Sequence, residues 1–180
     1  LGNLILGENV EQTYGRIISM LSILFEKNII PIIIGGSHDL LYANYRAYDS
    51  FKSTVNIVNI DSNFDIGDSA KPINNLSYLG KIILDEPHNL FNYSNLGYQT
   101  YHNSQEEIDL MENLYFESYR LGEVCSNIRL SEPVMRDADI VSIDLKSVRA
   151  SELSSRQKFS PNGFDGKEIC ALSRYAGISN

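Results

Sequence analysis

A short apolar run that ends in clustered aspartates constrains this chain most. Residues 54–60 read TVNIVNI, which is rich in β-branched side chains, and the next five residues are Asp61-Ser62-Asn63-Phe64-Asp65. Such a run predicts a strand that is buried on both faces, as in parallel sheets flanked by helices. Asp is common in turns, but an aspartate placed directly after a buried strand is harder to explain as an ordinary turn residue. The run therefore predicts a sheet with a polar edge.

Two further apolar runs predict strands of the same kind. Ile29–Ile34 ends at Gly35-Gly36-Ser37-His38, and Ala138–Ile143 ends at Asp144-Leu145-Lys146. Helices are expected at Glu8–Lys27, Leu40–Tyr48, Gln105–Tyr119 and from the capping-box pattern Asp165/Glu168 to Gly177, and short strands at Lys81–Leu84 and Ser94–Gln99. Strands that alternate with helices indicate an α/β fold, a three-layer α/β/α arrangement with a parallel sheet.

Composition narrows the class of protein. With 180 residues and 43% hydrophobic content, the chain is expected to form a single domain, incomplete at both ends. No window approaches the roughly 18 apolar residues of a membrane span, so no membrane partner is expected. The net charge of −8 argues against a nucleic-acid partner. Cys125 and Cys170 lack metal-type spacing and predict two reduced, packed thiols in a cytoplasmic protein.

The polar residues that follow the three expected strands predict a common site. Ligands of open parallel sheets bind at the carboxyl ends of the strands. Residues two apart on a strand share a face, so Asp61 should share its direction with Asn63, and Asp144 with Lys146. If the three strand ends are neighbours, the side chains that converge are His38, Asp61, Asp65 and Asp144. One imidazole and three carboxylates suit Mn²⁺ or a similar divalent ion.

The motifs GGSH, DSNFD and SIDLK, with PNGF ahead of a helix that ends RYAGIS, resemble the ureohydrolase family of arginase, agmatinase and formimidoylglutamase. The resemblance runs from about Ile29 to the end of the sequence and is strongest to formimidoylglutamase-like members. It implies an arginase/deacetylase-like fold and hydrolysis of linear C–N bonds in amidines or guanidines. It also implies two Mn²⁺ ions that share a bridging hydroxide.

The departures from the family pattern concern the second ion. By the resemblance, the first ion maps to His38, Asp61, Asp65 and Asp144, which are all present, whereas the second ion needs ligands where this chain has Asn63 and Lys146. An amide is a poor ligand and an ammonium repels a cation, so at most one Mn²⁺ is expected. The Lys146 ammonium could offset the charge that three carboxylates leave beside one divalent ion. Without a metal, it would have to bridge the carboxylates as a buried ion pair.

Two functions stay open. The first is an impaired ureohydrolase that acts on a small amidine or guanidine, and the second is a non-catalytic homologue that keeps the fold for binding or assembly. The family's proton-shuttle histidine would fall near residues 78–80, where no histidine occurs, so no catalytic residue is assigned. A zinc deacetylase is disfavoured because Asn63 takes the place of a histidine ligand. A homo-oligomer is what the resemblance implies.

Overall fold

The computed structural model describes residues 2–51, 53–68, 70–153 and 160–178. Contacts within the chain divide it into two compact units, one formed by residues 1–54 with 65–89 and the other by residues 55–64 with 90–180. The chain therefore enters the second unit at residue 55, leaves it after residue 64 and returns at residue 90. The single domain expected from the composition stays a prediction.

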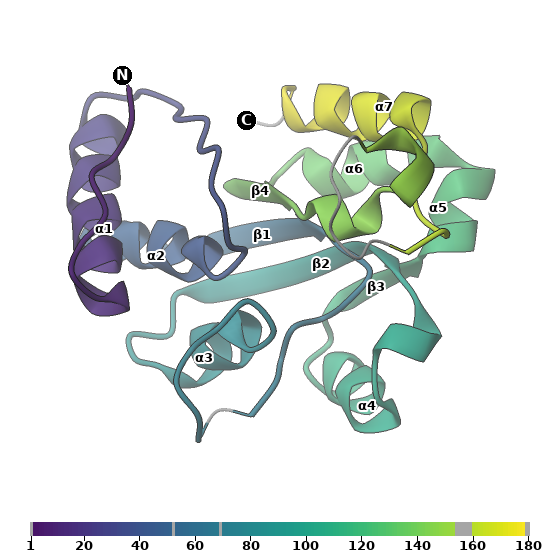
Figure 1. Cartoon of the computed structure of the whole chain (residues 1–180), viewed down its shortest axis with the longest axis horizontal. Helices are drawn as coiled ribbons and strands as arrows, with labels where there is room; N and C mark the ends of the chain where they lie inside the picture. The colour runs from purple at the N-terminus through teal and green to yellow at the C-terminus, as the bar shows by residue number, and fades with distance from the viewer. Residues whose placement is uncertain (1, 52, 69, 154–159, 179–180) are drawn as a thin grey trace. The chain divides into compact units, whose positions relative to one another are not determined.

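The second unit is built on a parallel four-stranded sheet (Figure 1). Its strands are β1 (Val55–Ile60), β2 (Leu90–Tyr98), β3 (Glu117–Arg120) and β4 (Ile140–Ile143), in the order β3-β2-β1-β4. β1 is paired on both sides, with Ile60 opposite Leu96 of β2 and Ile143 of β4. Because β1 is central, its apolar side chains are buried on both faces, as its sequence predicts.

Helices flank this sheet on both faces. One face carries α5 (Leu121–Ser126), α6 (Ser131–Met135) and α7 (Gly166–Ala176), which lie together above the strands in Figure 1. Their core joins sheet and helix residues, namely Val58, Ile60, Leu96, Leu121, Val124, Met135 and Leu172. The opposite face meets α4 (Gln105–Asn113) and the segment after it, where Tyr93 of β2 packs on Phe116. The expected α/β architecture with a parallel sheet between helices is confirmed.

The first unit is helical. It contains α1 (Val10–Glu26), α2 (Leu40–Arg46), the 3₁₀ turn η1 (Ala47–Phe51) and α3 (Tyr78–Leu84). The apolar stripe of α1 buries Tyr14, Ile17, Leu21 and Leu24 together with Ala43 and Ala47. Arg46 is buried; its guanidinium donates to the Glu86 carbonyl at 2.8 Å and pairs with Asp49 at 2.8 Å. This arginine therefore ties α2 to the segment that follows α3.

The strand expected at residues 29–34 is wrong. These residues form no regular element, and Ile30, Ile32 and Ile34 are 87%, 91% and 96% exposed. A strand needs a hydrogen-bonded neighbour, and all four strands of the described residues belong to the other unit. An apolar sequence by itself does not ensure that a neighbouring strand is present.

Two other expectations of secondary structure need correction. Lys81–Leu84 lies in helix α3, because a short apolar run does not distinguish a strand from a buried helical turn. The helix expected over Gln105–Tyr119 ends at Asn113, and β3 begins at Glu117. Tyr115 between them has a left-handed backbone (φ 58°), which a helix cannot continue through. The short helices α5 and α6 were not foreseen.

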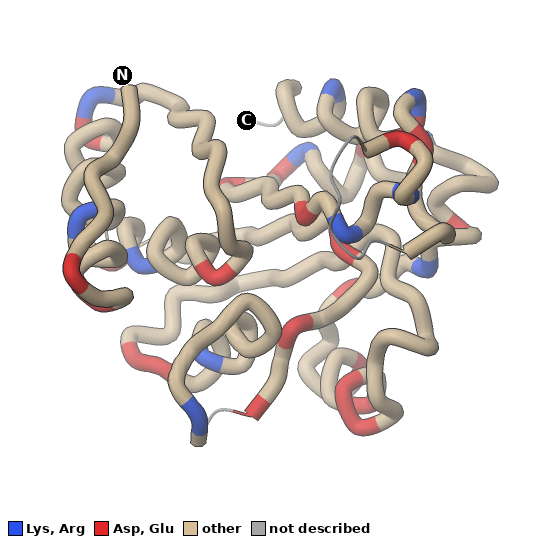
Figure 2. The backbone as a smooth tube through the Cα atoms, in the orientation of Figure 1, with Lys and Arg blue, Asp and Glu red and all other residues tan. Residues whose placement is uncertain are grey.

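The structure agrees in part with what the composition predicts for the charged residues and the cysteines. Lys and Arg positions are interspersed with Asp and Glu along the described chain (Figure 2). Both cysteines are free of disulfides, but Cys170 is exposed, so the expectation of packing holds for the partly buried Cys125 alone. Among the described residues, no helix is both long and apolar enough to cross a membrane.

Candidate functional site

The loop after β1 holds the first cluster of candidate residues. Asp61 is fully buried, and its Oδ1 accepts a hydrogen bond from the Asn63 N–H at 3.2 Å. The Asn63 amide donates from Nδ2 to the His102 carbonyl at 3.1 Å, and its Oδ1 accepts from the Ser62 hydroxyl at 2.9 Å. The expectation that Asp61 and Asn63 share a strand face is wrong, because β1 ends at Ile60 and the chain turns. Asn63 instead uses both ends of its amide to brace this turn.

Asn103 also holds this loop, and sequence reasoning missed it. Its Oδ1 accepts from the Phe64 N–H at 2.8 Å, and its Nδ2 donates to the Ser62 carbonyl at 3.0 Å. Gln99 adds a backbone N–H to the same Ser62 carbonyl at 3.0 Å. The one signal in the sequence is an Asn just before the Ser104 that caps α4. The carboxyl end of β2 and the turn after it therefore brace the Asp61 loop.

The end of β4 holds the second cluster. Asp144 caps the 3₁₀ turn η4 (Leu145–Ser147), and its Oδ1 accepts the Lys146 N–H at 2.7 Å. The Lys146 ammonium lies 3.2 Å from Asp144 Oδ2 and 3.7 Å from Asp61 Oδ2. Lys146 and Asp144 do meet, but through a turn rather than along a strand face. The Lys146 side chain is thus close enough to form ion pairs with two carboxylates of the second unit.

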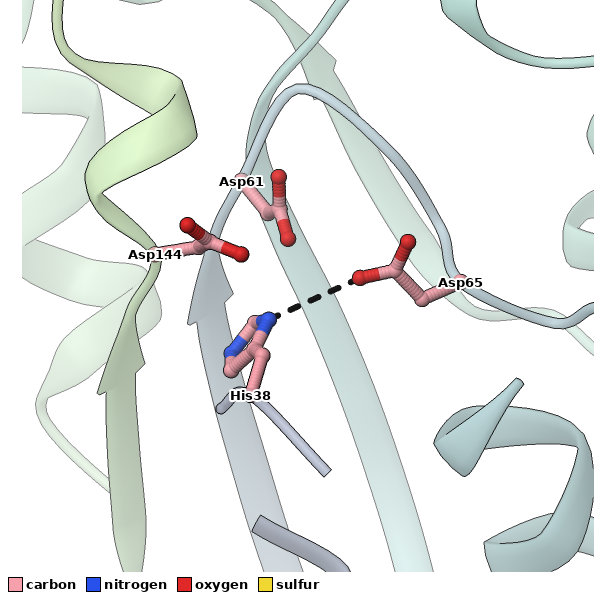
Figure 3. A group of neighbouring side chains, drawn as sticks. All are labelled: His38, Asp61, Asp65 and Asp144. Atoms are coloured by element: carbon pink, nitrogen blue, oxygen red, sulfur yellow. Dashed lines mark ion pairs between the residues drawn. The ribbon is translucent and has the colours of Figure 1, made fainter. Parts of the chain in front are cut away.

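The first unit brings His38 and Asp65 together (Figure 3, dashed line). His38 Nδ1 lies 3.5 Å from Asp65 Oδ2, and both side chains are nearly buried. The His38 ring packs on Tyr78, with the ring centroids 4.8 Å apart. Asp65 has a left-handed backbone (φ 55°), which Asp tolerates better than most residues, and its carbonyl accepts from the Leu79 N–H at 3.2 Å. Packing against α3 therefore holds this imidazole and this carboxylate in place.

The four residues that the sequence nominates as metal ligands have side chains of the kind that a divalent ion prefers. Figure 3 draws all four, one imidazole and three carboxylates, and they suit Mn²⁺ better than a soft metal. Asp61 and Asp65 are at most 4% exposed, and a buried carboxylate needs a compensating cation. In the second unit, the Lys146 ammonium lies near the carboxylates of both Asp61 and Asp144. That all four residues ligate one ion stays a prediction.

Comparisons with known proteins place the chain in context. A sequence model of the arginase family matches residues 1–175. A formimidoylglutamase from Macrococcus caseolyticus is 29% identical over 118 residues, which make up 64% of this chain and 36% of that protein. The chain thus spans little more than a third of this curated relative.

Solved structures share the fold at low sequence identity. The formiminoglutamase of Trypanosoma cruzi, solved with Mn²⁺, matches with a TM-score of 0.82 at 16% identity, over 93% of this chain and 59% of that one. The formimidoylglutamase of Bacillus subtilis matches with a TM-score of 0.82 at 17% identity, over 97% of this chain and 58% of that one. At these identities the likeness concerns the fold, and the chain spans about three-fifths of either protein.

Proposed function

Because the chain belongs to the arginase family, we propose that it is part of a formimidoylglutamase-like hydrolase of linear C–N bonds with at most one Mn²⁺. Its substrate is a small amidine or guanidine. The observation that carries the proposal is the placement of Lys146, whose ammonium lies 3.2 Å from Asp144 and 3.7 Å from Asp61. By the family pattern, a carboxylate that binds a second metal ion would stand at position 146.

The ligands of the single ion are His38, Asp61, Asp65 and Asp144. Charge balance supports this set, because three carboxylates, one ammonium and one divalent ion sum to zero when His38 is neutral. A bound Mn²⁺ supplies an acidified water and polarises the group under attack. The residues of this chain orient that chemistry: Tyr78 holds the His38 ring, and the Asn63 N–H holds the Asp61 carboxylate.

Asn63 and Lys146 lower the catalytic capacity of the site. A pair of metal ions clamps an attacked centre from both sides, which one ion cannot do. The Asn63 amide is committed to the His102 carbonyl and the Ser62 hydroxyl, so neither end is presented to a metal. The Lys146 ammonium supplies one positive charge where the family pattern has a second divalent ion, and it would bring no metal-bound water to the reaction.

A second candidate function is favoured by the same lysine. If the ammonium of Lys146 compensates the negative charge of Asp61 and Asp144, the second unit needs no metal ion. The chain is then a non-catalytic homologue that binds a partner. Metal content separates the two candidates. The protein is dialysed against Mn²⁺ and then against metal-free buffer, and the metal is measured by elemental analysis. About one Mn²⁺ per chain that is lost in His38→Ala supports the hydrolase, whereas no retained metal supports the second candidate.

A reversal experiment tests the inherited metal site directly. The double substitution Asn63→His with Lys146→Asp restores the two ligands of the family pattern, and we expect it to raise the content to about two Mn²⁺ per chain. The matched control is Asn113→His with Lys167→Asp, which makes the same changes at exposed positions of α4 and α7. An unchanged metal content in the double variant, with the fold intact by circular dichroism, would overturn the account of a lost second site.

A further inference from the structure

A row of polar side chains crosses the sheet of the second unit. Asn95 of β2 lies opposite Asn59 of β1, and the row continues into the outer strands with Ser118 and Ser142. Both asparagines are 0% exposed, in strands that otherwise bury mainly apolar side chains. Asn is depleted in strands and is mostly found at protein surfaces. Two buried asparagines side by side therefore need an explanation other than packing.

Among the described residues, the Asn95 amide makes a hydrogen bond at one end only. Its Nδ2 donates to the Asn63 carbonyl at 3.1 Å, whereas its buried Oδ1 has no hydrogen-bond partner there. A buried acceptor without a donor lowers the stability of the fold, and an apolar side chain would avoid this cost. The residue is therefore better explained by what its Nδ2 holds than by the stability of the sheet.

The backbone of Asn63 connects Asn95 to a candidate metal ligand. The Asn63 carbonyl accepts from Asn95, and the Asn63 N–H donates to Asp61 Oδ1 at 3.2 Å. The Asn63 side chain is also held, between the His102 carbonyl and the Ser62 hydroxyl. All of these hydrogen bonds lie within the second unit. Asn95 thus holds the residue that orients the Asp61 carboxylate.

The position of Asn95 in β2 makes it a precise support. β2 is paired on both sides, with β1 and β3. Gln99 and Asn103, which hold the same loop, lie beyond its last residue, whereas Asn95 lies inside the strand. Supports on strands hold a site more precisely than supports on loops. Residues that orient metal ligands from outside typically change the metal affinity by roughly 10–100-fold when they are removed.

We infer that Asn95 is a positioning residue, which orients Asp61 through the backbone of Asn63. Its effect on metal affinity rests on the proposed function, whereas its effect on the loop does not. The role requires the Nδ2 donor alone, because the Asn63 carbonyl is the group that it holds. It also gives a reason for a buried asparagine whose Oδ1 has no partner among the described residues.

The test replaces Asn95 by Leu and by Ala in the whole chain. One side chain is larger and the other smaller than Asn, so an effect that both variants share comes from the lost donor. In the metal-free protein, with EDTA present, amide exchange followed by NMR should be about tenfold faster at the Asn63 N–H in both variants. After EDTA is removed, titration with Mn²⁺ followed by electron paramagnetic resonance should give a dissociation constant about tenfold higher than that of the wild type.

The matched control is Tyr93→Phe. Tyr93 lies two residues before Asn95 on the same strand face and is also fully buried, and its hydroxyl accepts from Asn59 Nδ2 at 3.0 Å. The variant removes a buried hydrogen bond between strands rather than one to the Asp61 loop. It should lower the urea midpoint and leave both the Asn63 exchange rate and the Mn²⁺ dissociation constant unchanged. The control therefore separates a loss of stability from a loss of positioning.

Two outcomes would overturn the inference. Wild-type exchange at the Asn63 N–H in both Asn95 variants would show that the loop does not depend on this amide. A Mn²⁺ dissociation constant that stays at the wild-type value while the urea midpoint falls would show that Asn95 supports only the fold. If the wild type binds no Mn²⁺, the proposed single-ion hydrolase fails, and the exchange rates alone decide whether Asn95 positions Asp61.

Discussion

Lys146 and Arg149 lie three residues apart in the sequence and differ in how closely carboxylate groups approach their charged side chains. Lys146 approaches two carboxylates of the Asp61 and Asp144 cluster, whereas the Arg149 guanidinium has no carboxylate closer than 3.7 Å among its recorded ion pairs. The Lys146 charge is therefore close to carboxylates of the loop after β1 and of the turn after β4. The Arg149 charge lies farther from its carboxylate neighbours.

The two thiols provide a prediction at the residue scale. Burial, and then a hydrogen bond to Glu168, raise the pKa of Cys125 to about 12. Its thiolate fraction at pH 8 is then about one in ten thousand, and the thiolate is the reactive form. Cys170 is exposed on α7. We expect iodoacetamide to label one thiol per native chain quickly at pH 8, and two in urea, as measured by mass spectrometry.

Cys170→Ser is the control for this labelling. The native variant should lose the fast phase while urea still exposes one thiol. Rapid labelling of Cys125 in the folded variant would contradict the burial of this thiol.

The capping box of α7 provides a prediction at the element scale. The N–H groups of Glu168 and Lys167 donate to the Asp165 carboxylate at 2.8 and 2.9 Å, and the Glu168 bond is the main reason that the pKa of Asp165 lies below its usual value. A folded-state pKa below the unfolded one adds stability above the unfolded pKa, about 3.9, and that stability is lost as the pH falls through the folded pKa. Asp165→Ala should therefore lower the urea midpoint at pH 7, with the difference closing below about pH 4.

The substitution Asp165→Asn separates the contribution of the N-cap hydrogen bonds from the contribution of the carboxylate charge. Asn keeps a side-chain acceptor at the N-cap but does not titrate. It should stay near the wild-type midpoint at pH 7 and show a weaker dependence on pH. A difference between Asp165→Ala and wild type that is equally large at pH 3 and pH 7 would show that the carboxylate charge contributes nothing.

The exposed run at residues 29–34 provides a second prediction at this scale. Ile30, Ile32 and Ile34 are exposed apolar side chains of an irregular segment, and exposed apolar surface favours association with other chains. Ile32→Lys should reduce self-association in light scattering and leave the urea midpoint unchanged. The matched control, Ile57→Lys in the buried centre of β1, should unfold the protein. A large drop in the midpoint of Ile32→Lys would show that this run is buried in solution.

The whole molecule contributes candidate metal ligands from each of its two units. His38 and Asp65 belong to the first unit, and Asp61 and Asp144 to the second. A ligand that binds only the folded state stabilises it by about 2.7 kcal/mol at a concentration of 100 times its dissociation constant. Mn²⁺ should therefore raise the melting temperature of the wild type, and EDTA should reverse the rise. This shift should vanish in His38→Ala and also in Asp144→Ala.

The comparison between these two variants is informative. If only one of them abolishes the Mn²⁺ shift, the ion is held within a single unit and the four-ligand proposal is wrong. The exposed Lys167→Asp serves as the control and should keep the full shift.

By itself, the sequence determined the features that depend on neighbours along the chain. The apolar run of β1, the stripe of α1 and the Asp165/Glu168 cap were all predicted, because burial periodicity and capping act over a few residues. The resemblance to ureohydrolases also rests on short ordered motifs. Local patterns of this kind were sufficient to identify the family and to nominate candidate metal ligands.

Only the tertiary structure decided the features that depend on distant partners. Residues 29–34 are apolar enough for a strand but pair with none of the strands of the described residues, and Lys81–Leu84 lies in a helix. Lys146 reaches Asp61, 85 positions away, through a turn that no alternation pattern predicts. Arg120 at the end of β3 and Arg149, six residues after the end of β4, line one cavity although β3 and β4 are the two outer strands of the sheet. Hydrogen-bond partners and ion pairs between distant segments are set by packing, which a single sequence does not display.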